Sequence, residues 1–211
     1  MRKTAEPRER IGRSRWLLVN IVAGDSPASA LDAWRRLRAL GAHYLQPSVC
    51  LLPEHPETAA AIERIAGRVE RTGGHARVFA IGLLDDAAEH DVIAAFSAER
   101  ADEYEQVVSR TQEFLAEIAM ERDRGRTTYT ELEESETDLK RLQRWLSSIR
   151  KRDYFDAPGH QAAAEAVARC ERSLAEFEAE AFSVEVHPGE EDIARAPWRL
   201  RLRSLGVAAG R

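Results

Sequence analysis

Residues 42–53 have the sequence AHYLQPSVCLLP, and this stretch determines the fold predicted for the first part of the chain. Aromatic and β-branched residues lie on both sides of Gln46-Pro47-Ser48. Such residues favour strands, whereas proline and serine favour turns. The segment therefore predicts either two short strands joined by a turn or one strand with a bend.

The residues before this stretch predict a strand followed by a helix. Residues 16–22 form a nearly continuous apolar run of strand length. Pro27 suits the first position of a helix, and Gly41 stands where a left-handed C-cap is expected. The predicted helix places four apolar residues close to one face: Ala30, Trp34, Leu37 and Leu40.

The residues after the stretch predict a second helix and a last strand. Pro56 opens the helix, whose apolar stripe consists of Ala61, Ile62, Ile65, Ala66 and Val69. Gly73-Gly74 ends it, and residues 76–81 alternate as a strand does. The order β-α-β(β)-α-β predicts an α+β fold, with a ferredoxin-like split βαβ sandwich over residues 15–85.

From residue 86 the apolar pattern changes to a helical period. Three series recur at steps of three and four residues: Tyr104, Val107, Thr111, Phe114 and Ile118; then Leu132, Ser135, Leu139, Leu142, Leu146 and Ile149; then Ala163, Val167, Cys170, Leu174, Phe177 and Ala181. Narrow stripes of this kind are typical of helices that pack together. Residues 86–182 are therefore predicted to form an antiparallel helical hairpin or a three-helix bundle.

Charge is spread unevenly along the 211 residues, whose formal net charge is −5. Residues 1–38 carry nine basic and four acidic side chains, whereas residues 85–138 carry five basic and seventeen acidic ones. Residues 193–211 carry five arginines and no acid. We therefore expect a basic arm at 1–14 and a basic tail at 183–211. Such patches either meet an anionic partner or are simply solvated.

The composition excludes several classes of protein. The apolar runs are too short to span a membrane, so no membrane partner is expected. No apolar stretch follows the basic N-terminus, which argues against a secretory signal. Cys50 and Cys170 are 120 positions apart, which fits neither a disulfide framework nor a zinc site. We interpret both as small buried residues and expect a reducing cytoplasm.

No sequence motif for catalysis is found. Phosphate-binding glycine loops, HExxH and GxSxG are absent, and the six histidines show no ligand spacing. The carboxylates of Glu131, Glu133, Glu134 and Glu136 are interpreted as the solvated face of a helix. We therefore expect no enzyme, no catalytic residue, no metal and no cofactor.

Arg35, Arg36 and Arg38 are the candidate residues for binding an anion or a nucleic acid. On a helix Arg35 and Arg38 are neighbours at i, i+3, and Arg36 lies to one side. Guanidinium groups suit phosphates and other tetrahedral oxyanions, because their fork can hold two oxygens at once. Trp34, Leu37 and Leu40 are expected to anchor this helix to the sheet. The alternative is that the three arginines form only a solvated face.

Several blocks of the sequence, in order, resemble chromate resistance proteins of the ChrB type, in the N-terminal region of that family. The blocks are Trp16-Leu17-Leu18, Trp34 to Ala42, Tyr44-Leu45-Gln46, Val49 to Pro53, Gly73-Gly74 and Arg152 to Gly159, the last reading RDYFDAPG. The resemblance covers roughly residues 14–182. A weaker similarity, at Gly41-Ala42, Leu45-Gln46 and Ser48-Val49, links the first part to the ferredoxin-like module of PaaX-type repressors and of a small CRISPR adaptation nuclease.

The resemblance implies a cytoplasmic protein with a role in chromate-responsive transcription. The resemblance also implies that full-length family members carry a further C-terminal domain, which we do not expect within the 211 residues. DNA or a chromate-type oxyanion is the partner it implies. A second hypothesis is a non-catalytic interaction module that partners a separate sensor domain. A third hypothesis is a nuclease-like or reductase enzyme. Edge strands and helical stripes also predict self-association as a homodimer.

Overall fold

The computed structural model describes residues 16–22, 24, 27–83, 85–124 and 129–186, without the side chains of 129–130 and 181–186. The arm predicted at 1–14 and residues 187–211 of the predicted tail lie outside this part. The chain divides into two compact units. The sheet unit comprises Met1–Gln106 with Arg144–Ala163, and the helical unit comprises Val107–Gln143 with Ala164–Arg211.

The sheet unit contains four strands and two short helices in the predicted order. Residues 42–53 form two strands joined by a turn at Pro47-Ser48, not one bent strand. The elements are β1 (Trp16–Val22), α1 (Pro27–Ala39), β2 (His43–Gln46), β3 (Val49–Pro53), α2 (Pro56–Arg71) and β4 (His75–Ile81). Gly41 has a φ of 79°, which is the left-handed conformation expected of the residue that follows α1.

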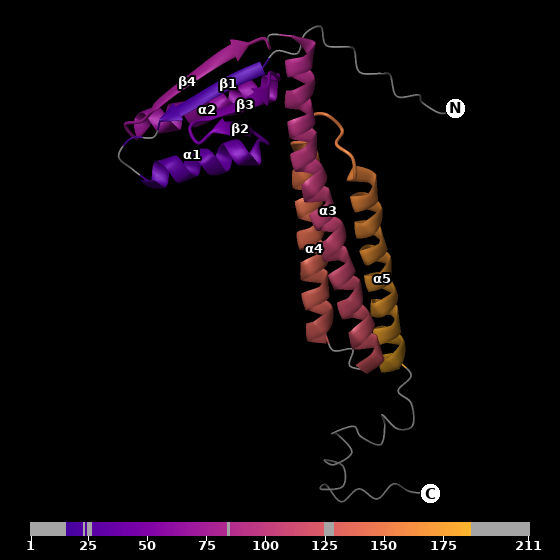
Figure 1. Cartoon of the computed structure of the whole chain (residues 1–211). Helices are drawn as coiled ribbons and strands as arrows, with labels where there is room; N and C mark the ends of the chain where they lie inside the picture. Colours follow the sequence, from indigo (N-terminus) through magenta and orange to yellow (C-terminus); the bar gives the residue numbers. More distant parts are fainter. Residues whose placement is uncertain (1–15, 23, 25–26, 84, 125–128, 187–211) are drawn as a thin grey trace, which may run out of the picture. The chain divides into compact units, whose positions relative to one another are not determined.

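The four strands form one sheet in the order β2-β3-β1-β4 (Figure 1). β1 lies inside it and pairs antiparallel with both β3 and β4, so that Leu18 stands opposite Leu51 on one side and Phe79 on the other. β2 and β3 pair antiparallel as a hairpin. The α+β class is thus confirmed, while the closer likeness to a ferredoxin-like sandwich stays a prediction.

Each face of the sheet has its own core. α1 and α2 cover one face, where alternate strand residues pack against them (Figure 1). This core comprises Leu17, Val19, Ala33, Leu37, Ala42, Cys50, Leu52, Ile62, Ile65 and Val69. The other face holds an aromatic cluster, in which the ring centroids of Trp16, Phe96 and Phe155 lie 5.6–5.7 Å apart.

Three long helices follow: α3 (Asp86–Arg124), α4 (Tyr129–Lys151) and α5 (His160–Val186). Their segments in the helical unit lie side by side (Figure 1), so a three-helix arrangement replaces the alternative of a hairpin. Most residues of the predicted stripes are buried there, namely Val107, Thr111, Phe114, Ile118, Leu139, Leu142, Val167, Cys170, Leu174 and Phe177. Leu132 and Ser135 are half-buried, and the side chain of Ala181 lies outside the described part.

Polar contacts join the three helices at the surface of the helical unit. Arg122 of α3 makes ion pairs with Glu180 at 3.1 Å and with Glu176 at 3.6 Å, both on α5. The amide of Gln143 on α4 donates to Glu171 at 2.7 Å. These polar contacts link both α3 and α4 to α5, so they stabilise the same three-helix packing that the buried stripes form.

The predicted domain boundaries at 85 and 182 do not coincide with the edges of the two units. α3 begins in the sheet unit, where Phe96 joins the aromatic cluster and Tyr104 is buried. α5 runs to Val186, beyond the predicted start of the tail. Among the described residues, no helix is long and apolar enough to cross a membrane.

Replacing Leu139 by alanine tests the helical core. Leu139 is 8% exposed, so Leu139→Ala should lower the free energy of unfolding by about 2–5 kcal/mol through lost burial and a residual cavity. Ser147→Ala, at an exposed position of the same helix, is the control. Denaturant unfolding followed by circular dichroism measures both, and an unchanged midpoint for Leu139→Ala would contradict the packing.

The two cysteines should be silent toward thiol reagents in the folded protein. Both are free and buried, and burial raises the pKa of Cys50 to about 12 and that of Cys170 to about 11. At pH values near 8 almost no reactive thiolate is therefore present. Ellman's reagent should modify neither thiol under native conditions and both after denaturation. Rapid native labelling would show that the sites are open.

Candidate functional site

The three arginines predicted as a binding site are exposed on α1. Arg36 donates from Nε to Asp32 Oδ2 at 2.7 Å. The guanidinium of Arg38 lies over the indole ring of Trp34, 5.0 Å from its centroid. Arg35 makes no hydrogen bond or ion pair with the described residues. The three side chains thus differ in how firmly they are held, and Arg35 is the least constrained.

Trp34 does not anchor α1 to the sheet, contrary to the sequence prediction. Its side chain is 41% exposed, whereas Ala33 and Leu37 are the buried residues of this helix. Successive helix positions are rotated by about 100°, so a core contact centred on Ala33 and Leu37 leaves Trp34 on the flank. The ring instead makes a cation–π contact with the guanidinium of Arg38.

α2 adds three more arginines beside α1. The hydroxyls of Ser29 and Thr72 lie 2.6 Å apart, which joins the start of α1 to the end of α2. Arg64, Arg68 and Arg71 are exposed, and their spacing of four and three residues places them along one side of α2. The sequence analysis missed them, because only the helix pairing brings them next to α1.

One carboxylate shows that arginines from both helices share a surface. The pKa of Asp32 is lowered mainly by the hydrogen bond from Arg36, and the charges of Arg68 and Arg35 lower it further. Asp32 is therefore within electrostatic reach of both helices' cations. We call these exposed residues the α1–α2 arginine surface: Arg35, Arg36, Arg38, Arg64, Arg68 and Arg71.

A second charged cluster in the sheet unit surrounds a buried arginine. Arg100 of α3, with a side chain only 7% exposed, pairs with Glu103 at 2.9 Å and with Glu99 at 3.2 Å. Arg152 pairs with the other oxygen of Glu103 at 2.9 Å, and His43 Nδ1 lies 2.7 Å from Glu99. Each guanidinium is thus paired with a carboxylate that compensates its charge, although Arg100 Nη1 and Arg152 Nε have no hydrogen-bond partner among the described residues.

The charged cluster around Arg100 holds the segment 152–159, which the family resemblance had singled out. Asp153 accepts hydrogen bonds from the Tyr104 hydroxyl at 3.0 Å and from the backbone N–H of Ala157 at 3.0 and 3.1 Å. The Tyr154 hydroxyl donates to the carbonyl of Leu40 at 2.7 Å. The segment is therefore tied both to α3 and to the end of α1.

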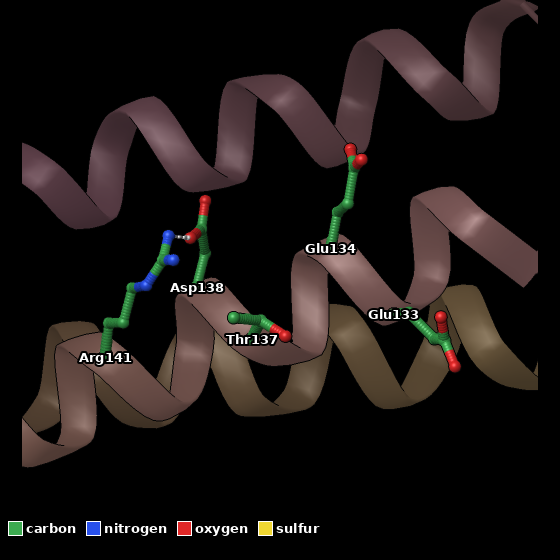
Figure 2. Close-up of a pocket in the computed structure, with 5 residues that line it drawn as sticks. All are labelled: Glu133, Glu134, Thr137, Asp138 and Arg141. Atoms are coloured by element: carbon green, nitrogen blue, oxygen red, sulfur yellow. Dashed lines mark hydrogen bonds and ion pairs between the residues drawn. The ribbon is translucent and has the colours of Figure 1, made fainter.

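α4 contributes a shallow hollow in the helical unit. Figure 2 shows its lining residues, Glu133, Glu134, Thr137, Asp138 and Arg141, of which Arg141 donates to Asp138 at 2.6 Å. Three carboxylates against one guanidinium make this hollow unsuitable for an anion. It agrees with the interpretation of this stretch of α4 as a charged, solvated helix face.

No arrangement for metal binding is found in the part of the chain that the structure describes. Three or more histidine, cysteine, aspartate or glutamate side chains are nowhere gathered there in a way that could hold an ion. Among the described residues, the α1–α2 arginine surface is therefore the candidate binding site that we consider further.

Comparison with known proteins shows which family the chain resembles. Residues 31–188 match the family described as "Protein ChrB, N-terminal". The chain belongs to this family. It is also 29% identical to Protein ChrB of Cupriavidus metallidurans over 178 residues. These aligned residues cover 83% of this chain and 48% of that protein. The chain thus spans about half the length of this ChrB relative, and the resemblance predicted from the sequence is confirmed.

Replacing Gly41 by alanine tests how tightly segment 152–159 is packed. A Cβ on Gly41 would lie 2.8 Å from the Cβ of Arg152, whereas a Cβ on Gly73 would meet no described atom within 4 Å. Both glycines have a φ near 80°, so alanine costs about 1–2 kcal/mol of backbone strain at either position. Crowding against Arg152 should lower the free energy of unfolding of Gly41→Ala by a further ~1–3 kcal/mol. Equal denaturation midpoints for the two variants would contradict this contact.

Proposed function

We propose that this protein acts in chromate-responsive transcriptional control, and that its sheet unit binds the phosphate backbone of DNA through the α1–α2 arginine surface. Membership of the ChrB family supports the link to chromate resistance. The observation that carries the proposal is the convergence of exposed arginines from two helices around Asp32. The proposed role is non-catalytic and belongs in the cytoplasm.

An extended polyanion fits this surface better than a small free oxyanion. A chromate ion has few oxygens, and tight binding in water requires several donors converging on it from a partly enclosed site. The arginines instead follow the exposed sides of two helices. Phosphates repeat along DNA, and many separate, weak contacts to them add up because each releases counterions. DNA is therefore the partner we favour.

The arginines are expected to contribute unequally. Arg36 is already paired with Asp32, so its charge is partly neutralised before any phosphate arrives. Arg38 keeps its charge but is oriented by the Trp34 ring. Arg35 and Arg68 act on Asp32 only through the longer-range field, which leaves their donors available. These two should account for most of the phosphate contacts.

The double variant Arg35→Gln/Arg68→Gln should weaken binding to DNA of the protein's own promoter. Glutamine keeps hydrogen-bonding length but removes the charge, so two phosphate contacts lose their counterion release. The slope of log K against log salt should fall by about one for each lost contact, hence about two in all. Fluorescence anisotropy at several salt concentrations measures this slope.

The matched control is Arg141→Gln/Arg172→Gln, which removes two exposed charges from the helical unit and should leave the slope unchanged. Calorimetric titration with sodium chromate forms the second arm. Chromate binding that disappears in Arg35→Gln/Arg68→Gln, with DNA binding intact, would show that the surface serves a small oxyanion. A folded Arg35→Gln/Arg68→Gln protein with the wild-type salt slope would reject the proposal.

A further inference from the structure

The outer edge of strand β4 is an interaction surface that the proposed function does not use. β4 stands at one end of the strand order, and no strand among the described residues pairs with its outer side. Its seven residues read HARVFAI, of which Val78 and Phe79 are 40% and 48% exposed. An edge of this length, with apolar side chains, is a template for pairing with another strand.

The other edge of the same sheet, strand β2, is protected against pairing with a further strand, whereas β4 is not. β2 has only four residues, its pairing with β3 is irregular between Tyr44 and Gln46, and Pro47 follows it directly. Short strands, irregular register and proline are devices that prevent edge-to-edge pairing. β4 has no proline or lysine, and its register with β1 is continuous over all seven residues. In the part of the chain that the structure describes, β4 is therefore the edge that is left open.

The side chains of β4 alternate between two surroundings. Val78 stands opposite Val19, which belongs to the core beneath α1 and α2. Arg77 and Phe79 point to the other face of the sheet, since successive strand residues alternate. Arg77 is exposed and makes no ion pair with the described residues. A cation and an aromatic ring thus stand two residues apart on one face, with Val78 between them.

We propose that β4 pairs antiparallel with β4 of a second copy of this chain, with Val78 at the two-fold axis. This register places Val78 opposite the partner's Val78. Arg77 then lies opposite the partner's Phe79, and Ala76 opposite the partner's Ala80. The two four-stranded sheets become one continuous sheet.

The strand is complementary to itself in this register, which favours a second copy over another partner. A guanidinium facing an aromatic ring is attractive, and the two-fold axis forms that pair twice. Small residues face small ones, and no like charges stand directly opposite. The proposal is independent of the DNA-binding proposal, because it uses none of the α1–α2 arginines.

Lysine at the two-fold axis tests the proposal. In Val78→Lys two ammonium groups would stand directly opposite each other, which destabilises a strand pair. Light scattering at high micromolar concentration should give a dimer for the wild type and the 23.7 kDa monomer for Val78→Lys. The dimer dissociation constant should rise at least about tenfold. Leu45→Lys, on the protected edge and 49% exposed, is the matched control and should stay dimeric.

Two further variants test the register. Phe79→Glu should retain the dimer, because the new carboxylate lies opposite the partner's Arg77, although it removes an apolar side chain. Val78→Cys should be linked into a covalent dimer by a short bifunctional thiol cross-linker, because directly opposite Cβ atoms are about 5 Å apart. Ala80→Cys should not, because the residue opposite it is the partner's Ala76. The native cysteines are buried and give no background.

The β4–β4 dimer can be tested even if one variant fails to fold. Circular dichroism shows whether Val78→Lys is folded, and if it is not, cross-linking by Val78→Cys gives the answer. A monomeric wild type would overturn the proposal. So would a dimer that persists in folded Val78→Lys, or a dimer that Leu45→Lys abolishes. Failure of Val78→Cys to cross-link would exclude the proposed register.

Discussion

The carboxylate of Glu103 lies between two largely buried guanidinium groups, and the organisation of the sheet unit depends on it. One oxygen pairs with Arg100 of the same helix and the other with Arg152, which lies far along the chain. Removing one member of a buried ion pair leaves an uncompensated charge and costs several kcal/mol. Segment 152–159 is therefore fixed against α3, and with it Phe155 in the aromatic cluster and Tyr154 at the end of α1.

α1 and α2 perform two tasks with two sides of the same helices. Ala33 and Leu37 of α1, and Ile62 and Val69 of α2, are buried against the sheet, while arginines occupy positions turned away from it. A helix can separate these tasks because residues three and four apart share a side. The arginine side chains can therefore be changed with little effect on the core, which makes the proposed function testable without unfolding the unit.

The sequence predicts the elements well because they rest on local patterns. Alternation in residues 76–81, the proline at the start of α2 and the helical stripes of α3 to α5 all concern residues a few positions apart. The position of Trp34 was predicted wrongly because Ala33 is as compatible with the core as Trp34, and the larger apolar area of tryptophan makes its burial the expected choice. The pairing of Arg152 with Glu103 and the approach of Arg68 to Asp32 could not be predicted, because each joins residues distant in the chain.

The two cysteines give each unit an internal reporter of its own. Cys50 is buried beneath α1 and α2 in the sheet unit, and Cys170 is buried between helices in the helical unit, its thiol near the carbonyl of Thr111. A reagent reaches such a thiol only when its surroundings open, so each modification rate measures the free energy of opening of one unit. Equal rates would mean that the units open together in one cooperative step. Different rates would identify the unit that opens first.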